Sequence, residues 1–263
     1  TSQINFRGTS DLGNGMKADF RVETDWNPVS NKANTGSVPA TGSTYDKGTA
    51  GTFGNGELRV GLSAGFGRVD FGAVNMNGLT TLLTGQPFGT AIGGGYGSVI
   101  RVNAAGTAVR EDQSFRYNTP TFSGFAGTFL KSNKQTKAVD STTVQQTSFS
   151  TTLGAYDKLG VQEVGVTYVN GPLAANYNTA KFDSKSVGTG TTESTVNTLA
   201  AAYTMGAAKF MFLNQTNKTD TNTVNTAYTS VAATYTMGQT VLMATTGSLK
   251  AKAGDFNGKK STI

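Results

Sequence analysis

The segment Q-S-F-R-Y-N-T-P-T-F-S-G-F-A-G-T-F, which spans Gln113–Phe129, has the pattern that decides the fold class. Its first half alternates: Phe115 and Tyr117 lie on one face of an extended chain, and polar residues that include Arg116 lie on the other. Pro120 ends this run because it has no N–H group to donate to a strand ladder. The chain then resumes as a second strand within the same segment. We therefore predict a β-ribbon with one apolar and one polar face.

The clearest strand pattern in the chain runs over Met16–Trp26. One face carries apolar side chains such as Phe20 and Val22, and the other carries five charged side chains in succession. Five charges cannot enter an apolar core without a large desolvation cost, so this face must contact water. A soluble sandwich could turn the charged face outward. A large barrel could instead turn it inward, around a water-filled lumen, with the apolar face against lipid.

Short turns alternate with long connections along the chain. The Asn14-Gly15 pair favours a tight turn at positive φ, whereas we expect polar loops over 183–193, 216–225 and 251–260. Strands are expected to begin at Ser2, Met16, Glu57, Arg68, Gln113, Phe125, Val161, Leu173, Thr195, Lys209, Ala227 and Val241, with part of another at Ser261. Short turns at one end and long loops at the other are typical of outer-membrane barrels. The predicted fold is all-β: a transmembrane antiparallel β-barrel with about twelve to thirteen strands in this chain.

Composition excludes several classes of function. The 263 residues include no Cys and no His, which removes disulfides, thiolate metal sites, His-dependent triads and the common zinc sites. The net charge is +6, but the basic residues are scattered, so no nucleic-acid partner is expected. No apolar run is long enough for a transmembrane helix. We expect no enzyme activity, no metal and no cofactor.

Five separate motifs resemble the Gram-negative general porins, most closely their β-proteobacterial branch. They are F-R-G-T-S-D-L-G-N-G-M-K-A-D-F at Phe6–Phe20, V-G-L-S-A-G-F-G-R-V-D-F-G at Val60–Gly72, R-Y-N-T-P-T-F-S-G-F at Arg116–Phe125, Y-V-N-G-P-L at Tyr168–Leu173 and N-G-K-K-S-T at Asn257–Thr262. Together they cover most of the chain in the family's order.

The resemblance implies a single sixteen-stranded barrel domain over residues 1–263, a homotrimer, and a third long loop folded into the lumen. Val74 to Arg110 would be that constriction loop, with Pro87, Phe88 and Gly89 as a structural element within it. The family's first strand would precede Thr1 and its last strands would follow Ile263. Because unpaired backbone groups at an open sheet edge are prohibitive in lipid, we expect the natural chain to be longer.

Arg59 and Arg116 are the first candidates for pore-lining cations, because basic side chains in a pore favour anions. Each could instead be an ordinary Arg paired with a nearby acid. The other candidates for the pore wall or constriction are Arg7, Lys17, Arg21, Arg68, Arg101, Glu111 and Asp112. Related anion-selecting porins carry a ladder of Arg on this wall. Here Gln3 and Ala73 stand where the family often has Arg, and acids at 19, 23, 57 and 70 interrupt the series. We expect a modest anion preference.

The predicted function is passive diffusion of small hydrophilic solutes and inorganic ions across a bacterial outer membrane. The expected partners are outer-membrane lipid and identical subunits. The alternative is a secreted or surface-anchored β-sandwich that binds a partner through its Thr-, Ser- and Asn-rich loops. Such a protein would not need apolar outward faces on nearly every strand and would stay in solution without detergent.

Overall fold

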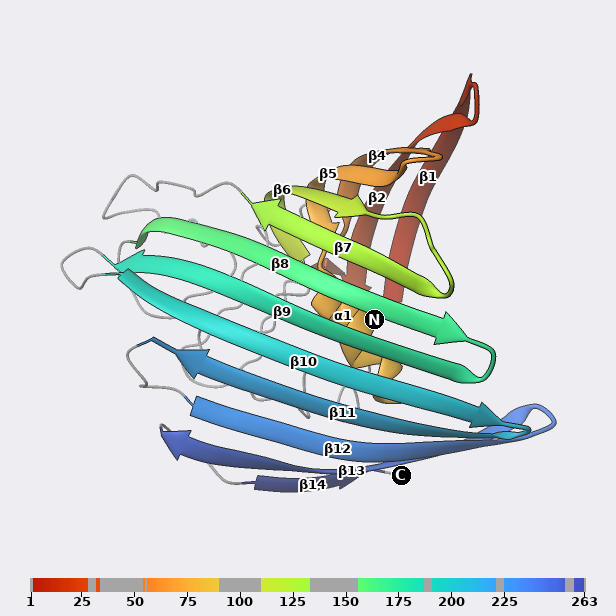
Figure 1. Ribbon diagram of the computed structural model, residues 1–263, viewed down its shortest axis with the longest axis vertical. Helices are drawn as coiled ribbons and strands as arrows, with labels where there is room; N and C mark the ends of the chain where they lie inside the picture. The colour runs from red at the N-terminus through yellow and green to blue at the C-terminus, as the bar shows by residue number, and fades with distance from the viewer. Residues whose placement is uncertain are drawn as a thin grey trace.

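The computed structural model describes residues 2–27, 32–33, 54, 56–89, 110–132, 156–186, 191–220, 225–253 and 258–262. Fourteen strands and one helix occur in these residues (Figure 1): β1 (Ser2–Gly13), β2 (Met16–Asn27), β3 (Lys32–Ala33), β4 (Leu58–Ala64), β5 (Gly67–Asn75), α1 (Asn77–Thr84), β6 (Arg110–Asn118), β7 (Phe125–Ser132), β8 (Tyr156–Asn170), β9 (Leu173–Ser186), β10 (Thr191–Met205), β11 (Ala208–Thr219), β12 (Asn225–Met237), β13 (Thr240–Ala253) and β14 (Gly258–Thr262).

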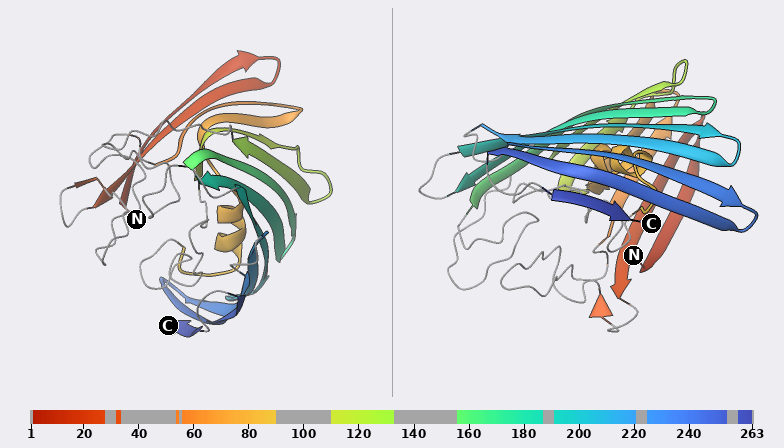
Figure 2. Two further views of the ribbon diagram at one scale, coloured as in Figure 1. Left: turned by 90° about the vertical axis from the view of Figure 1, so that its left-hand side faces the viewer. Right: turned by 90° about the horizontal axis from the view of Figure 1, so that it is seen from below.

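All the described strands belong to one antiparallel sheet. They pair in chain order from β1 to β14, except that the two-residue β3 pairs only with β2. The sheet curves into an open trough, and α1 lies on its concave side (Figure 2). The prediction of an all-β antiparallel fold with about twelve to thirteen strands in this chain is confirmed. Sixteen strands remain a prediction, since β1 and β14 form the two edges of the described sheet.

Glycine-containing turns connect the strands at one end. Asn14 and Gly15 have φ of 51° and 75°, which is the left-handed geometry that an Asn-Gly hairpin turn requires. Gly171, Gly206 and Gly238 also have positive φ at the three hairpins that follow β8, β10 and β12. These turns lie where the sequence predicted them, because a residue without a Cβ atom adopts this geometry at little cost.

Several predicted boundaries were wrong. The segment 74–110 is not all loop: β5 continues to Asn75, α1 follows, and β6 begins at Arg110. Loops were predicted over 183–193, 216–225 and 251–260, but the described ends of these segments belong to strands β9 to β14: residues 183–186, 191–193, 216–219, 225, 251–253 and 258–260. Judged by local sequence, stretches of Thr, Ser and Asn favour loops. Here their backbone groups form hydrogen bonds with the neighbouring strands, and this tertiary pairing overrides the local preference.

The sheet has its polar face inside and its apolar face outside. Asp70 and Phe71 are neighbours on β5, yet Asp70 is 0% exposed and Phe71 is 52% exposed. Phe20 and Val60 on adjacent strands are also exposed. A soluble sandwich would show the reverse arrangement. In the part of the chain that the structure describes, the one helix is too short to cross a membrane.

Candidate functional site

A network of ion pairs covers the concave face of β2, β4, β5 and β6. Asp70 lies at its centre, where its carboxylate accepts hydrogen bonds from three arginines: Arg59 at 3.1 Å, Arg68 at 2.9 Å and Arg116 at 2.7 Å. Asp19 on β2, which is separated from β5 by β4, accepts from Arg59 at 2.6 Å and from Arg68 at 2.7 Å. Two carboxylates therefore hold three guanidinium groups in fixed positions, as charge-assisted hydrogen bonds do.

A second group of ion pairs continues this network toward the end of β2. Arg21 pairs with Glu23 and donates to Glu57 at 2.8 Å, and Arg110 on β6 lies 3.6 Å from Glu23. Arg21 and Arg59 lie directly opposite one another on β2 and β4. Because Glu57 contacts both of them, the repulsion between these like charges is offset.

Gly61 leaves room for the side chains of this network because it has no side chain of its own. Gly61 pairs with Asp19 on one side and with Asp70 on the other. A Cβ atom at Gly61 would lie 2.3 Å from Nη2 of Arg68 and 2.7 Å from Oδ1 of Asp70. The Arg68 guanidinium can reach both carboxylates because position 61 has no side chain.

The described network contains five arginines and four carboxylates, so almost all of its charge is compensated. The first two candidates, Arg59 and Arg116, lie in this network together with Arg21 and Arg68. Among the described residues, no ion pair involves Arg7 or Lys17, and both side chains are exposed. The remaining candidates are Glu111, which is buried, Asp112, whose backbone alone is described, and Arg101, which lies outside the described residues.

The opposite part of the concave face is covered by α1 (Figure 2). Leu82 of the helix is fully buried against Ala200, Leu213 and Tyr228, which lie on β10, β11 and β12. Gly85 ends the helix so close to the wall that a Cβ atom there would lie 2.8 Å from the Leu213 Cβ atom. This half of the inner wall is thus apolar where the helix packs on it.

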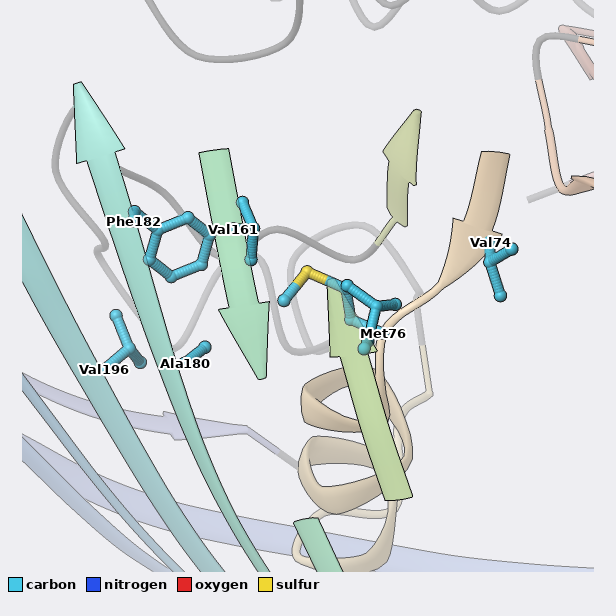
Figure 3. Close-up of a cluster of buried hydrophobic side chains, with 7 residues drawn as sticks. Val74, Met76, Val161, Ala180, Phe182 and Val196 are labelled. Atoms are coloured by element: carbon cyan, nitrogen blue, oxygen red, sulfur yellow. The ribbon is translucent and has the colours of Figure 1, made fainter. Parts of the chain in front are cut away.

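A cluster of apolar side chains fixes the start of this segment. Met76 packs with Val161, Ala180 and Phe182 of the wall (Figure 3). The remaining members of the cluster are Val74, Leu130 and Val196. Burying these side chains against the wall stabilises the position from which the helix begins, since each Val, Leu, Phe or Met side chain contributes on the order of 1.5–3 kcal/mol when fully removed from water.

Glu163 on β8 binds the first turn of α1. Its Oε2 atom accepts a hydrogen bond from the Asn77 N–H at 2.7 Å, and its Oε1 atom accepts one from the Gly78 N–H at 2.8 Å. The carboxylate is fully buried. These two N–H groups have no partner within the helix, so a strand residue far away in sequence satisfies them.

The predicted Pro87-Phe88-Gly89 element lies directly after the helix. The Gln86 side chain holds it as a turn: its Nε2 atom donates to the Gly89 carbonyl at 2.7 Å, and its Oε1 atom accepts from the Phe88 N–H at 2.8 Å. Gly89 has a φ of 57°, which favours glycine. That the wider segment 74–110 constricts a pore remains a prediction.

Sequence reasoning missed two residues of this site. Arg110 was treated as part of a loop, although it begins β6 and joins the ion-pair network. Glu163 was noted only as an alternating strand residue. The available signal was its position: it is an acid on the inward face of β8, with the uncharged residues Gly165 and Thr167 next on that face. The described residues contain no cluster of acids arranged to bind a metal ion.

The outer face carries an apolar band that is tilted relative to the strands. On alternate strands, three outward apolar residues are followed by one polar residue: Tyr168, Val166, Val164 and Gln162 on β8, Tyr203, Ala201, Leu199 and Asn197 on β10, and Tyr235, Ala233, Val231 and Thr229 on β12. Across the sheet from Gln162, the residue on β10 is Thr195, but the first polar residue after the apolar ones is Asn197, two positions nearer the short turn. The same shift separates Asn197 on β10 from Thr229 on β12. The edge of the apolar band thus shifts by two residues along the strands for every two strands crossed. With the usual rise per residue and strand spacing, this shift means that the strands are tilted by roughly 35° from the normal to the band, as in membrane-spanning barrels.

A sequentially paired antiparallel sheet with an apolar outer band, a charged inner wall and a helix on its concave side defines the class of outer-membrane β-barrel proteins. The family described as Gram-negative porin matches residues 1–263. The chain belongs to this family, and it is an outer-membrane protein.

Two relatives illustrate the similarity in sequence. Outer membrane porin protein 32 of Delftia acidovorans is 31% identical over 226 residues, which are 83% of this chain and 55% of that protein. An outer membrane porin protein of Bordetella pertussis is 30% identical over 177 residues, which are 65% of this chain and 40% of that protein. The chain therefore spans about half the length of the curated relatives it matches.

Solved structures agree with this assignment. The anion-selective porin from Comamonas acidovorans superimposes with a TM-score of 0.73 at 25% identity, over 96% of this chain and 69% of that one. OmpF of Salmonella typhi gives a TM-score of 0.55 at 11% identity, which supports the fold alone. The alternative of a secreted β-sandwich adhesin is not supported, since both the family and the inside-out distribution of side chains contradict it.

Proposed function

We propose that the protein is a general diffusion porin, which lets small hydrophilic solutes and inorganic ions cross the outer membrane without chemical conversion. The observation that carries this proposal is the contrast between the two faces of one sheet. The outward face is apolar and exposed, whereas the concave face holds Asp70 and the arginines that bind it. The side chains of these arginines remain partly exposed on the concave face, which favours water there because burying so many charges in a dry interior would carry a large desolvation cost.

The segment that contains α1 and the Pro87–Gly89 turn is proposed to narrow the passage. It is held on the concave side by Leu82, Met76 and Glu163, so it occupies space that the passage would otherwise have. The charged network lies on other strands, β2 to β6. Solutes would thus pass between a neutral, helix-covered wall and a charged wall.

A modest anion preference is proposed for this passage. Five arginines oppose four carboxylates in the described network, and the relative from Comamonas acidovorans is called anion-selective. The excess positive charge is small, so the preference should be weak. A homotrimer with no cofactor is proposed on the family resemblance, with outer-membrane lipid as its surroundings.

Planar-bilayer recordings on the detergent-purified protein test the diffusion proposal. We expect steady, nearly ohmic conductance steps, and swelling of proteoliposomes in small neutral sugars but not in large ones. A reversal potential measured in a KCl gradient should indicate weak anion preference. Insertion without any conductance would contradict the porin proposal, and a clear cation preference would contradict the selectivity proposal alone.

A further inference from the structure

We propose that Glu163 is the positioning residue that holds α1 against the barrel wall. The helix lacks its own N-terminal cap: Met76 at the cap position makes no side-chain hydrogen bond, and the first turn contains no acidic residue. Both favourable elements, an acceptor for the free N–H groups and a negative charge near the helix dipole, normally come from nearby residues. Here they come from a strand 86 positions away in sequence.

The geometry of this contact is specific to a carboxylate. Each of its two oxygens accepts one backbone N–H group, from Asn77 at 2.7 Å and from Gly78 at 2.8 Å. An amide group in the same place has only one oxygen, so one of the two N–H groups would face another donor. The two backbone N–H groups at the start of the helix are the main partners of the Glu163 carboxylate, with smaller contributions from the Asn178 side chain and the charge of Arg116.

A glycine on the helix and a glycine on β8 allow the first turn of α1 to lie close to the strand. A Cβ atom at Gly78 would lie 3.3 Å from Oε1 of Glu163, and a Cβ atom at Gly165 would lie 2.1 Å from Nδ2 of Asn77. The Asn77 side chain therefore lies over Gly165 of the same strand, and it also contacts Asn178 on β9. These features form a docking site built for the first turn of this helix.

Glu163 thereby links the wall to the segment proposed to narrow the passage. This consequence rests on the proposed function, whereas the anchoring contact itself does not. Loss of one charge-assisted hydrogen bond in a buried site should shift the equilibrium between docked and undocked helix by roughly 10- to 100-fold.

Spin labelling tests the anchor without any measurement of transport. The chain has no Cys, so Thr80→Cys places a single label on an exposed position of α1, and Thr229→Cys places one on the outer face of β12. We expect Glu163→Gln to increase the mobile fraction of the label at position 80 and to leave the label at position 229 unchanged. Glu163→Asp, which keeps the charge but shortens the side chain, should give an intermediate effect. Glu193→Gln on the outer face is the matched control and should give none.

Bilayer recordings on the same variants separate this inference from the proposed function. Greater label mobility together with larger current fluctuations would support both. Greater mobility with an unchanged current would support the anchor and contradict the assignment of this segment as the constriction. Label spectra that are unchanged by Glu163→Gln, in a protein that folds normally by its heat-dependent shift on gels, would overturn the inference whatever the current does.

Discussion

Asp70 and Arg116 lie directly opposite one another on β5 and β6, and the Asp70 carboxylate accepts a hydrogen bond from the Arg116 guanidinium at 2.7 Å. Arg116 also donates to the Asn75 carbonyl at 2.6 Å, which fixes its orientation. The same carboxylate binds Arg59 and Arg68. Asp70 therefore compensates positive charge on three arginines, two of which also bind Asp19. If the proposed function is correct, Asp70 limits the positive charge that these arginines present to a passing ion.

Replacing Asp70 by Asn should increase the anion preference. The change removes one negative charge from the network while the three arginines remain, so the reversal potential in a KCl gradient should shift in the anion direction. Stability should fall by about 1–3 kcal/mol, less than for a fully buried pair because the guanidinium groups keep contact with solvent. Glu193→Gln, which breaks the exposed pair with Lys181, is the control and should change neither quantity. An unchanged reversal potential in folded Asp70→Asn would contradict the assignment of this network to the passage.

Truncating Leu82 should weaken the packing of α1 on the wall. Leu82 is fully buried, whereas its neighbour Leu83 is 38% exposed, so the two residues form a matched pair on one helix. Leu82→Ala should reduce the free energy of docking by about 2–5 kcal/mol through lost burial and the cavity that remains. Hydrogen exchange measured by mass spectrometry over residues 77–84 should become much faster for Leu82→Ala and change little for Leu83→Ala. Equal effects of the two changes would show that the helix does not pack as described.

Adding a methyl group at Gly85 should push the helix end away from the wall. The new Cβ atom would lie 2.8 Å from the Leu213 Cβ atom and from the Phe212 carbonyl oxygen, and such overpacking costs about 1–3 kcal/mol. We expect a thiol reagent to label Thr81→Cys, a fully buried position, faster in the Gly85→Ala background. Gly65→Ala is the control because a Cβ atom there would meet nothing within 4 Å. The described contact would be wrong if both backgrounds were labelled at the same rate.

A charge in the middle of the outer band should hinder insertion into lipid. Val166 is the central residue of the three apolar outward residues on β8, whereas Phe122 lies at a turn and is 81% exposed. An Arg at a lipid-facing midplane position costs about 2–4 kcal/mol, and one near the interface about 0–1 kcal/mol. Urea titrations of folding into lipid vesicles should therefore show a large loss for Val166→Arg and a small one for Phe122→Arg. Equal losses would contradict the orientation of the band.

The sequence predicted the strands well because their signal is local. Alternation over Met16–Trp26 and the Asn14-Gly15 turn depend only on neighbouring residues, and both were correctly interpreted. Alternation alone left open whether the charged face pointed inward or outward, since the two arrangements use the same period of two residues. The resemblance to the porin motifs resolved that choice. The helix within 74–110 was not predicted from the sequence. It has only eight residues, so packing on the wall rather than its own sequence stabilises it.

By itself, the sequence determined which residues share a face, where the short turns lie and that no His or Cys chemistry is available. The tertiary structure alone decided that Asp70 binds three arginines and that Glu163 caps a helix that begins 86 positions earlier. The physical reason differs for the two contacts. The Asp70 contacts depend on the register between β4, β5 and β6, whereas the Glu163 contact requires the segment after β5 to fold back onto the concave side of the sheet. The period of two residues within a strand specifies neither the register nor the fold-back.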